Sequence, residues 1–202
     1  TGLSNDPNTV IKNFNLKLRQ RVLNADAINY GLTLAHMRKN DLASAKQLIS
    51  VLIANNPEQL IFRHTDIEID VASERLKSAE AKVDTLLQKN PTSYPLLLLK
   101  SEIFLKRKKY HQSSELLDFL TKHRPADPDI WYRLAEVNGL AGDIAGVHKA
   151  RAEYFILVGA FDRARKQLGR AATLLKDDFK ESAMIRQRLR DLAEMEDRVV
   201  KL

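Results

Sequence analysis

The chain has 202 residues, a net charge of +7 and 44% apolar residues, which is enough apolar material for a hydrophobic core. It has no cysteine, which excludes disulfides and thiolate metal sites. No apolar run approaches the roughly 20 residues that a membrane-spanning helix needs. The charge is spread along the chain: residues 1–50 hold seven basic and three acidic residues, and residues 160–202 hold eleven and eight. A nucleic-acid-binding protein concentrates basic residues in one patch, so we expect no nucleic-acid partner.

The chain begins with Thr1 and shows no secretory signal peptide, which is typical of a trimmed or processed fragment. Residues 1–8 include Asn-Asp-Pro-Asn and are expected to be frayed. Apolar residues then fall four apart, which predicts a flanking helix over residues 9–24. They are Val10, Phe14, Leu18 and Val22.

Residues 26–57 predict a hairpin of two amphipathic helices. Apolar residues recur at helical spacing in residues 28–35 and again in residues 45–52. Between the two stretches, Asp41 is placed to accept amide N–H bonds at the start of the second helix. Pro57 then ends the unit, because proline resists helical continuation.

The same closing proline returns at Pro91 and Pro125, so the intervals 91 − 57 and 125 − 91 are both 34. A 34-residue helix–turn–helix period is typical of tetratricopeptide (TPR) repeats, which gives further repeats over residues 60–91, 94–125 and 128–158. One hairpin cannot bury both of its apolar faces alone, whereas stacked hairpins can. We therefore predict an all-α, right-handed α-solenoid of TPR hairpins over residues 9–202, a single domain with about twelve helices.

The first helix of the second repeat has an unusual pattern. Asp66 and Asp70 alternate with apolar residues at 67, 69 and 71, which in isolation resembles a strand. The 34-residue period predicts a helix here instead. In the second helix of each repeat, small residues at Ala45, Ala79 and Ser113 mark a place where two helices cross closely.

The fourth repeat opens with Asp127 as a helix cap and a proline at the first helical position, and Trp131 and Leu134 hold its fourth and seventh places. Its turn at Gly142 recurs at Gly159, only 159 − 142 = 17 residues later. We therefore expect the helix after Gly142 to serve twice and to open a fifth hairpin over residues 145–176. A narrow apolar stripe then predicts a long capping helix over residues 179–200.

The sequence contains no motif for catalysis. It has no His-Glu-x-x-His, no glycine-rich phosphate loop and no Gly-x-Ser-x-Gly, so we expect no catalytic residue, no metal site and no cofactor in this chain. His64 and Glu68 stand four apart and form either half a metal site or a helix-surface pair. The basic run over residues 106–109 is read as a solvated turn or, alternatively, an anionic contact.

In a TPR array, the first helix of each hairpin lines a concave groove through its second, fifth, ninth, twelfth and thirteenth places. Aromatic and charged residues at these places suit a groove that binds an extended polypeptide. The alternative is that they are ordinary solvated positions. The candidate partner-binding residues are Tyr30, Arg38, His64, Glu68, Leu98, Glu102, Lys106, Tyr132, Glu136, Lys149 and Glu153.

Three stretches go beyond a generic TPR pattern: residues 25–45, Thr65-Asp66-Ile67-Glu68 and Ala150-Arg151-Ala152-Glu153-Tyr154 with Gly159, Asp162 and Ala164 after it. From about residue 8 onward, including the half-period step after Gly142, the chain resembles the C-terminal half of BepA-like periplasmic metalloproteases. Those proteins join a zinc protease domain bearing His-Glu-x-x-His to a C-terminal TPR domain.

The resemblance implies a periplasmic location and a role in the assembly and quality control of outer-membrane β-barrel proteins. Its implied partners are the β-barrel assembly machinery or its clients and the parent's own protease domain. Zinc would belong to that protease domain, outside this chain. The alternative is a freestanding cytoplasmic TPR scaffold with no enzyme attached. A signal peptide and His-Glu-x-x-His upstream of Thr1 would distinguish the first reading from the second.

Overall fold

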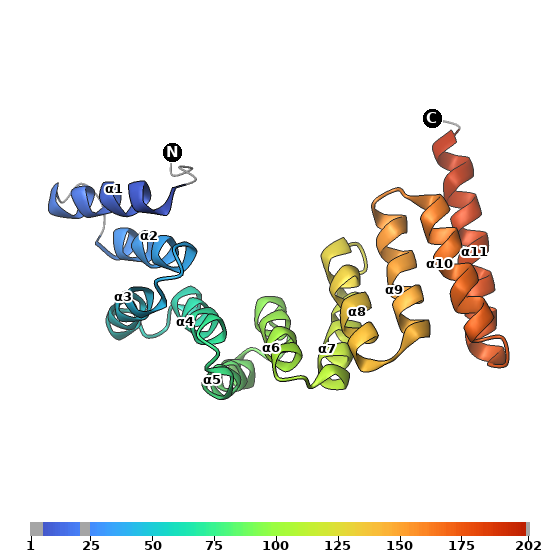
Figure 1. The fold of residues 1–202 in the computed structure, drawn as a ribbon, viewed down its shortest axis with the longest axis horizontal. Helices are drawn as coiled ribbons and strands as arrows, with labels where there is room; N and C mark the ends of the chain where they lie inside the picture. The colour runs from blue at the N-terminus through green and yellow to red at the C-terminus, as the bar shows by residue number, and fades with distance from the viewer. Residues whose placement is uncertain (1–5, 21–24, 201–202) are drawn as a thin grey trace. The chain divides into compact units, whose positions relative to one another are not determined.

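The computed structural model of the protein describes residues 6–20 and 25–200, and in this part of the chain it contains eleven α-helices and no strand (Figure 1). This is one helix fewer than predicted. The end predicted for the flanking helix, near residue 24, lies outside the described residues. The helices are α1 Pro7–Gln20, α2 Ala25–Arg38, α3 Leu42–Asn55, α4 Leu60–Ala72, α5 Leu76–Lys89, α6 Tyr94–Lys106, α7 Tyr110–His123, α8 Pro128–Ala141, α9 Ile144–Leu157, α10 Phe161–Leu174 and α11 Phe179–Val200.

The chain divides into two compact units, residues 1–99 and 100–202, and the division falls within α6. None of the helices over the described residues is long and apolar enough to cross a bilayer.

The 34-residue period is visible in the backbone itself. The angle φ is positive at four turn residues, Asn40, Glu74, Lys108 and Gly142, and 74 − 40, 108 − 74 and 142 − 108 all equal 34. A left-handed residue ends a helix sharply and lets the next helix turn back. The fifth such residue, Gly159, follows after half a period. The turns at Lys108, Gly142 and Gly159 therefore lie where the sequence predicted them.

In the unit of residues 1–99, α4 packs between α3 and α5, and this explains its strand-like sequence. A helix with neighbours on two sides buries residues around most of its circumference. Ile67, Ile69 and Val71 are all buried, and so are Asp66 and Asp70. The prediction of a helix over residues 60–72 is confirmed, and alternation here reflects burial on two faces.

In the unit of residues 100–202, α9 packs against both α8 and α10, as expected for a helix that serves two hairpins (Figure 1). Its Ala152 packs with Ala164 and Leu168 of α10 and Ile185 and Leu192 of α11 in one buried cluster. The small alanines let α9 and α10 approach closely. The long C-terminal helix therefore covers the apolar side of the last hairpin.

The predicted helix caps are present. Asp41 accepts a bond from Ser44 N at 3.2 Å, and Asp127 accepts one from Asp129 N at 3.1 Å. Trp131 is only half-buried, and its Nε1 donates to Pro125 O at 2.9 Å. The indole thus fastens the loop before α8, while Leu134, one turn further along α8, is buried.

We expect Ala45→Leu to lower the free energy of unfolding by about 1–3 kcal/mol, because overpacking a close helix crossing forces side chains and backbone apart. Ala45 has no exposed surface and packs with Ile49, Leu52 and Ile69. The control is Ala43→Leu, since Ala43 is exposed on the same helix. Urea titrations followed by far-ultraviolet circular dichroism measure both changes, and equal stabilities would contradict the crossing.

Candidate functional site

In the unit of residues 1–99, the predicted groove residues differ in their exposure and in their contacts with other side chains. Tyr30 is half-buried: its hydroxyl lies 3.1 Å from Thr65 Oγ1, and its ring lies 5.4 Å from that of Phe62. Arg38 is exposed at the end of α2, and Leu98 is half-buried on α6. Tyr30 therefore joins α2 to α4, which limits what it can offer a partner.

His64 and Glu68 pair with each other along α4, with Nδ1 and Oε2 3.5 Å apart. The hydrogen bond to Glu68 is the main cause that raises the pKa of His64, against the opposing effect of its partial burial. No group of three or more potential metal-ligating side chains exists within the described range, so the pair has no third ligand there. The geometry is that of a helix-surface ion pair.

We expect Glu68→Gln to lower the pKa of His64, because the substitution removes the charge that holds the imidazolium. Because the pKa of His64 is raised in the folded protein, the ion pair contributes its full stabilisation at pH values below the ordinary histidine pKa of about 6.5. This stabilisation is lost as the pH rises through the pKa of His64 in the folded protein. An NMR titration of the His64 ring protons in both proteins measures the change. An identical His64 pKa in the two would show that Glu68 does not hold the ring.

In the unit of residues 100–202, Lys149 and Glu153 are engaged by the C-terminal helix. Lys149 Nζ donates to Glu181 Oε2 at 2.8 Å. Arg188 donates to both carboxylate oxygens of Glu153, at 2.7 and 2.5 Å, and this bidentate pairing raises the pKa of Arg188. The sequence predicted these two residues in an open groove. The structure pairs both with α11, although Lys149 keeps 43% of its side-chain surface exposed.

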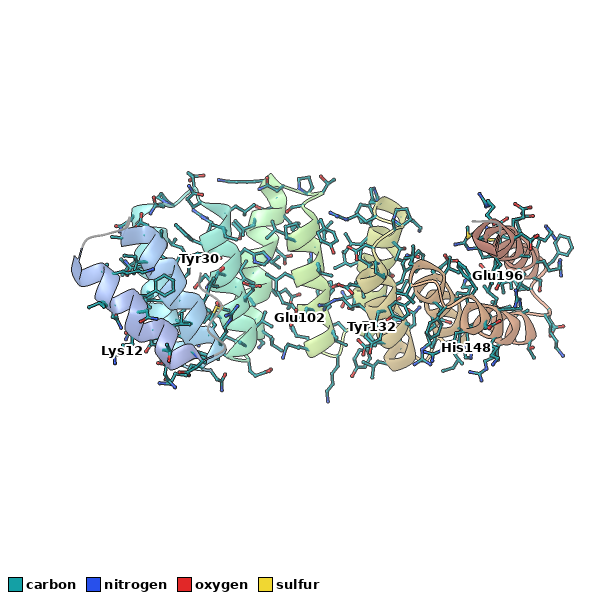
Figure 2. All side chains as sticks on the ribbon, turned by 90° about the horizontal axis from the view of Figure 1, so that it is seen from above. Lys12, Tyr30, Glu102, Tyr132, His148 and Glu196 are labelled. Atoms are coloured by element: carbon teal, nitrogen blue, oxygen red, sulfur yellow. The ribbon has the colours of Figure 1, made fainter. Side chains whose placement is uncertain are left out.

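The other predicted residues of this unit are Glu102, half-buried on α6, Lys106, exposed at the end of α6, and Tyr132 and Glu136, both exposed on α8. Figure 2 labels Glu102 and Tyr132. Tyr132 and Glu136 line a hollow of about 280 Å³, whereas Lys149 lines a separate hollow with Trp131 and Asn138. The half-period step is the reason: α9 closes one hairpin and opens the next, so its groove places turn away from those of α8.

We call the first of these the α8–α10 hollow. The residues lining it come from three consecutive helices. They are Tyr132, Ala135 and Glu136 of α8, Arg151, Tyr154 and Phe155 of α9, and Gln167 of α10.

Aromatic rings form one wall of the α8–α10 hollow. The ring of Tyr132 meets that of Tyr154 edge to face with centroids 5.6 Å apart, and Tyr154 meets Phe155 in the same way at 5.4 Å. Tyr132 keeps 51% of its surface exposed. Edge-to-face pairs hold rings in defined positions, and Tyr combines a large apolar surface with a polar end. This wall can therefore take up an apolar side chain without rearrangement.

Polar groups complete the α8–α10 hollow. Arg151 and Glu136 are exposed, and neither has an ion-pair partner within the described residues. Gln167 is only 9% exposed, and its Oε1 lies 2.6 Å from Nδ1 of His148, which Figure 2 labels on α9. Sequence reasoning found Tyr132 and Glu136. It missed Arg151 and Tyr154, because the frame assigned to α9 selected the opposite side of that helix, and it missed Gln167 because it named no candidate on α10.

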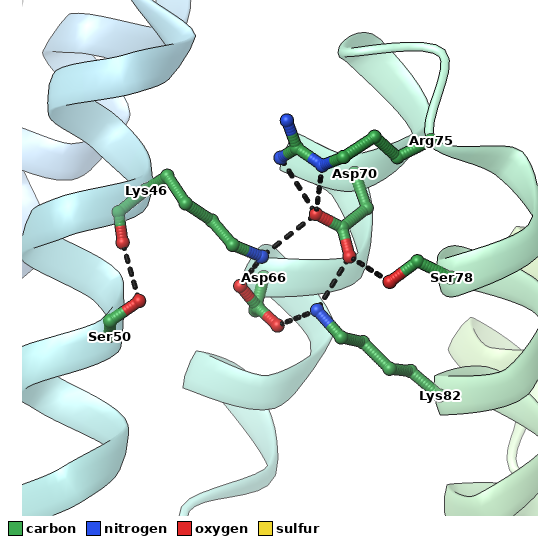
Figure 3. Close-up of polar contacts among 7 residues, drawn as sticks. All are labelled: Lys46, Ser50, Asp66, Asp70, Arg75, Ser78 and Lys82. Atoms are coloured by element: carbon green, nitrogen blue, oxygen red, sulfur yellow. Dashed lines mark hydrogen bonds and ion pairs between the residues drawn. The ribbon is translucent and has the colours of Figure 1, made fainter.

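A second polar feature, in the unit of residues 1–99, is a buried cluster around Asp66 and Asp70 of α4 (Figure 3). Lys46 of α3 contacts both carboxylates, and Lys82 of α5 donates to each at 2.5 Å. Arg75 and Ser78 also donate to Asp70, at 2.8 and 2.9 Å. We call these six residues the carboxylate cluster. It ties three helices together, and each of its two carboxylates accepts bonds from both lysines.

Burial alone would raise the pKa of Asp70. The hydrogen bonds from Lys46, Lys82, Arg75 and Ser78 outweigh that effect and hold the pKa well below its ordinary value. Asp70 therefore stays ionised at neutral pH, as an acceptor for the cations around it. The cluster is structural and explains why two aspartates are buried on α4.

No protein-family model matches the chain, and no curated protein does. Solved structures do match. PilW, a widely conserved type IV pilus biogenesis factor, aligns with a TM-score of 0.66 at 15% identity over 92% of this chain and 86% of its own. A TPR protein from Parabacteroides merdae aligns with a TM-score of 0.60, also at 15% identity, over 93% of this chain and 78% of its own. The chain has the tetratricopeptide-repeat fold.

A third match, the C-terminal part of a TPR protein from Cytophaga hutchinsonii, has a TM-score of 0.63 at 14% identity over 94% of this chain and 75% of that one. Since each match spans several hairpins, the predicted class, an α-solenoid of TPR hairpins, is confirmed. At these identities the likeness concerns the fold alone. What the chain binds has to be argued from its own surface.

Proposed function

We propose that this chain is a protein-interaction module that binds a segment of another polypeptide in the α8–α10 hollow. TPR hairpins present the side chains of successive helices on one surface, and such surfaces suit extended peptides. The observation that carries the proposal is the composition of the hollow. Half-exposed aromatic rings stand beside an arginine and a glutamate, Arg151 and Glu136, that have no ion-pair partner in the described structure.

Fold stability alone gives no reason for this arrangement. The other charged residues of α9, Lys149 and Glu153, are both paired with α11. Unpaired charges next to exposed rings are the features that dominate affinity where proteins meet, since aromatic and arginine anchors contribute most of the binding energy. A polypeptide segment would place apolar side chains on the rings and polar groups on Arg151 and Glu136.

The test is photo-crosslinking. A benzophenone amino acid replaces Tyr132 in one protein and Gln112, an exposed residue of α7, in the control. Both are irradiated in an extract of the host cell. We expect protein adducts from position 132 that disappear in a protein that also carries Arg151→Glu, and few adducts from position 112. Equal adducts from both positions would contradict binding in the hollow.

We further propose, on the sequence resemblance described above, that the module belongs to a periplasmic zinc metalloprotease acting on outer-membrane β-barrel proteins. What supports this part is the set of matching stretches, in particular Ala150-Arg151-Ala152-Glu153-Tyr154. The coding sequence upstream of Thr1 tests it. A signal peptide and His-Glu-x-x-His would support the protease parent, whereas a start codon directly upstream would favour a freestanding scaffold.

For the chain itself we predict no protease activity and no stoichiometric zinc, since the sequence carries no catalytic or metal-binding motif. Metal analysis after dialysis measures the zinc content. One tightly held zinc per chain would contradict the prediction and direct attention to His64 and Glu68.

A further inference from the structure

We infer that the segment bound in the α8–α10 hollow is acidic, with an aspartate or glutamate beside a large apolar side chain. The inference rests on the proposed function and specifies its partner. Three independent features of the hollow support it: the balance of unpaired charge, the position of Gln167 and the placement of the single acidic lining residue.

The charge balance comes from α9 and α10. Together these helices carry the cations Lys149, Arg151, Arg163, Arg165, Lys166 and Arg170 and the acids Glu153 and Asp162. Both acids are paired within the structure, Glu153 with Arg188 and Asp162 with Arg165. Lys149 and Arg165 are paired with acids of α11. Within the described residues, the cations that remain without an ion pair are Arg151, Arg163, Lys166 and Arg170.

One of these arginines, Arg151, lines the hollow. The guanidinium of Arg163 lies 5.8 Å from the ring centre of Phe155, a lining residue, but Arg163 itself lines a different hollow, with Glu196 and Asp197. On α10, Arg163 and Arg170 flank Gln167 at i−4 and i+3. Cations without an ion pair on the helices that line the hollow raise the local concentration of anionic groups and steer them toward it. An acidic segment is therefore the complementary occupant.

Gln167 adds a directed donor. Gln167 is only 9% exposed and its Oε1 contacts His148 Nδ1, so its amide is held in place. With His148 Nδ1–H donating to Oε1, the Oε1 atom is occupied, and the Nε2 amide has no protein partner in the described structure. Because Gln167 lines the hollow, Nε2 can donate to a carboxylate or to a peptide carbonyl there. Arg151 and Gln167 thus offer only donors on the α9–α10 side.

Glu136 sets the polarity of the hollow. It is the only acidic residue that lines the hollow and lies on α8, whereas Arg151 lies on α9 and Gln167 on α10. A carboxylate of the bound segment would be repelled by Glu136 and attracted by Arg151, so it should sit on the α9–α10 side. The rings of Tyr132 and Tyr154, which line the same hollow, would receive the neighbouring apolar side chain. Repulsion by Glu136 and attraction by Arg151 fix the direction of binding.

The experiment is a selection from a phage-displayed library of random peptides on the full chain, run in parallel on two variants and a control. Arg151→Glu reverses the charge at an exposed position. Gln167→Glu keeps an oxygen for His148 but removes the Nε2 donor. Gln112→Glu changes the charge of α7 by −1, as Gln167→Glu does on α10, away from the hollow.

On the native protein and on Gln112→Glu, we expect enrichment of peptides with Asp or Glu beside an aromatic or branched apolar residue. These peptides should bind Arg151→Glu and Gln167→Glu at least about tenfold more weakly, and Arg151→Glu should itself select basic peptides. Enrichment of neutral or basic peptides on the native protein would overturn the acidic partner and leave the proposed function standing. No enrichment on any of the proteins would count against both.

Discussion

Asp70→Asn is expected to lower the free energy of unfolding by about 2–4 kcal/mol, because it removes the buried charge on which two half-buried lysines and the exposed Arg75 converge. The carboxylate of Asp70 is 1% exposed, and it accepts bonds from Lys46, Lys82 and Arg75. An asparagine cannot neutralise these cations and turns an amide donor toward them. The expected loss of unfolding free energy is smaller than for a fully buried ion pair, because Lys46 and Lys82 keep 31% and 36% of their side-chain surface in solvent.

The matched control is Asp118→Asn, which removes an aspartate–lysine pair of similar length on an exposed surface. Asp118 and Lys122 lie 2.6 Å apart with side chains 54% and 69% exposed, and such pairs contribute less than about 1 kcal/mol. Urea unfolding compares the two variants, and hydrogen exchange of the α4 amides localises the effect. Equal losses from Asp70→Asn and Asp118→Asn would contradict the structural importance of the carboxylate cluster.

The stability difference between the native protein and Asp70→Asn should also depend on pH. Because the folded-state pKa of Asp70 is lowered, its contribution is fully present above the unfolded pKa of about 3.9. It is lost as the pH falls through the lowered folded value. Urea titrations between neutral and acidic pH should therefore show the difference narrowing only below about pH 4.

Leu192→Ala is expected to cost about 2–5 kcal/mol, the range for truncating a fully buried leucine. Leu192 has no exposed surface and packs in one cluster with Ile185 of its own helix, Leu168 and Ala171 of α10 and Ala152 of α9. The resulting cavity would loosen α11 from the hairpin below it. Because the cluster also contains Ala152 of α9, the substitution should reduce hydrogen-exchange protection in both α11 and α9.

Met184→Ala is the control on the same helix, because Met184 is 57% exposed and its truncation should change stability by less than about 0.5 kcal/mol. If Leu192→Ala were as mild as Met184→Ala, α11 would not be a structural cap. The ion pairs Lys149–Glu181 and Glu153–Arg188 would then have to hold the helix by themselves.

The helices and turns could be predicted because they follow local rules. Small residues such as Ala45 and the closing proline repeat at a fixed interval, and capping aspartates such as Asp41 act over a few residues. The helix α4 could also be predicted, although Asp66 and Asp70 give its sequence a strand-like pattern. The 34-residue period indicated a helix where the local pattern alone did not.

The site was less predictable because it depends on which helices become neighbours. Lys149 and Glu153 hold groove places in the repeat frame, yet both form ion pairs with α11, and nothing in the sequence near residue 150 indicates that contact. In the same way, the partners of Asp66 and Asp70 come from α3 and α5. The half-period step at Gly159 was recognised, but its effect on the direction in which Arg151 and Tyr154 face was not.

Binding of a polypeptide segment in the α8–α10 hollow can be tested by an NMR titration of the full chain with a peptide selected on it. We predict that the side-chain amide protons of Gln167 and the methyl group of Ala135 shift with the same saturation curve as the Tyr132 ring. We also predict that Arg151→Glu abolishes these shifts without changing the rest of the spectrum. Saturable shifts confined to residues outside the α8–α10 hollow, with Gln167 and Ala135 unchanged, would contradict binding in the hollow.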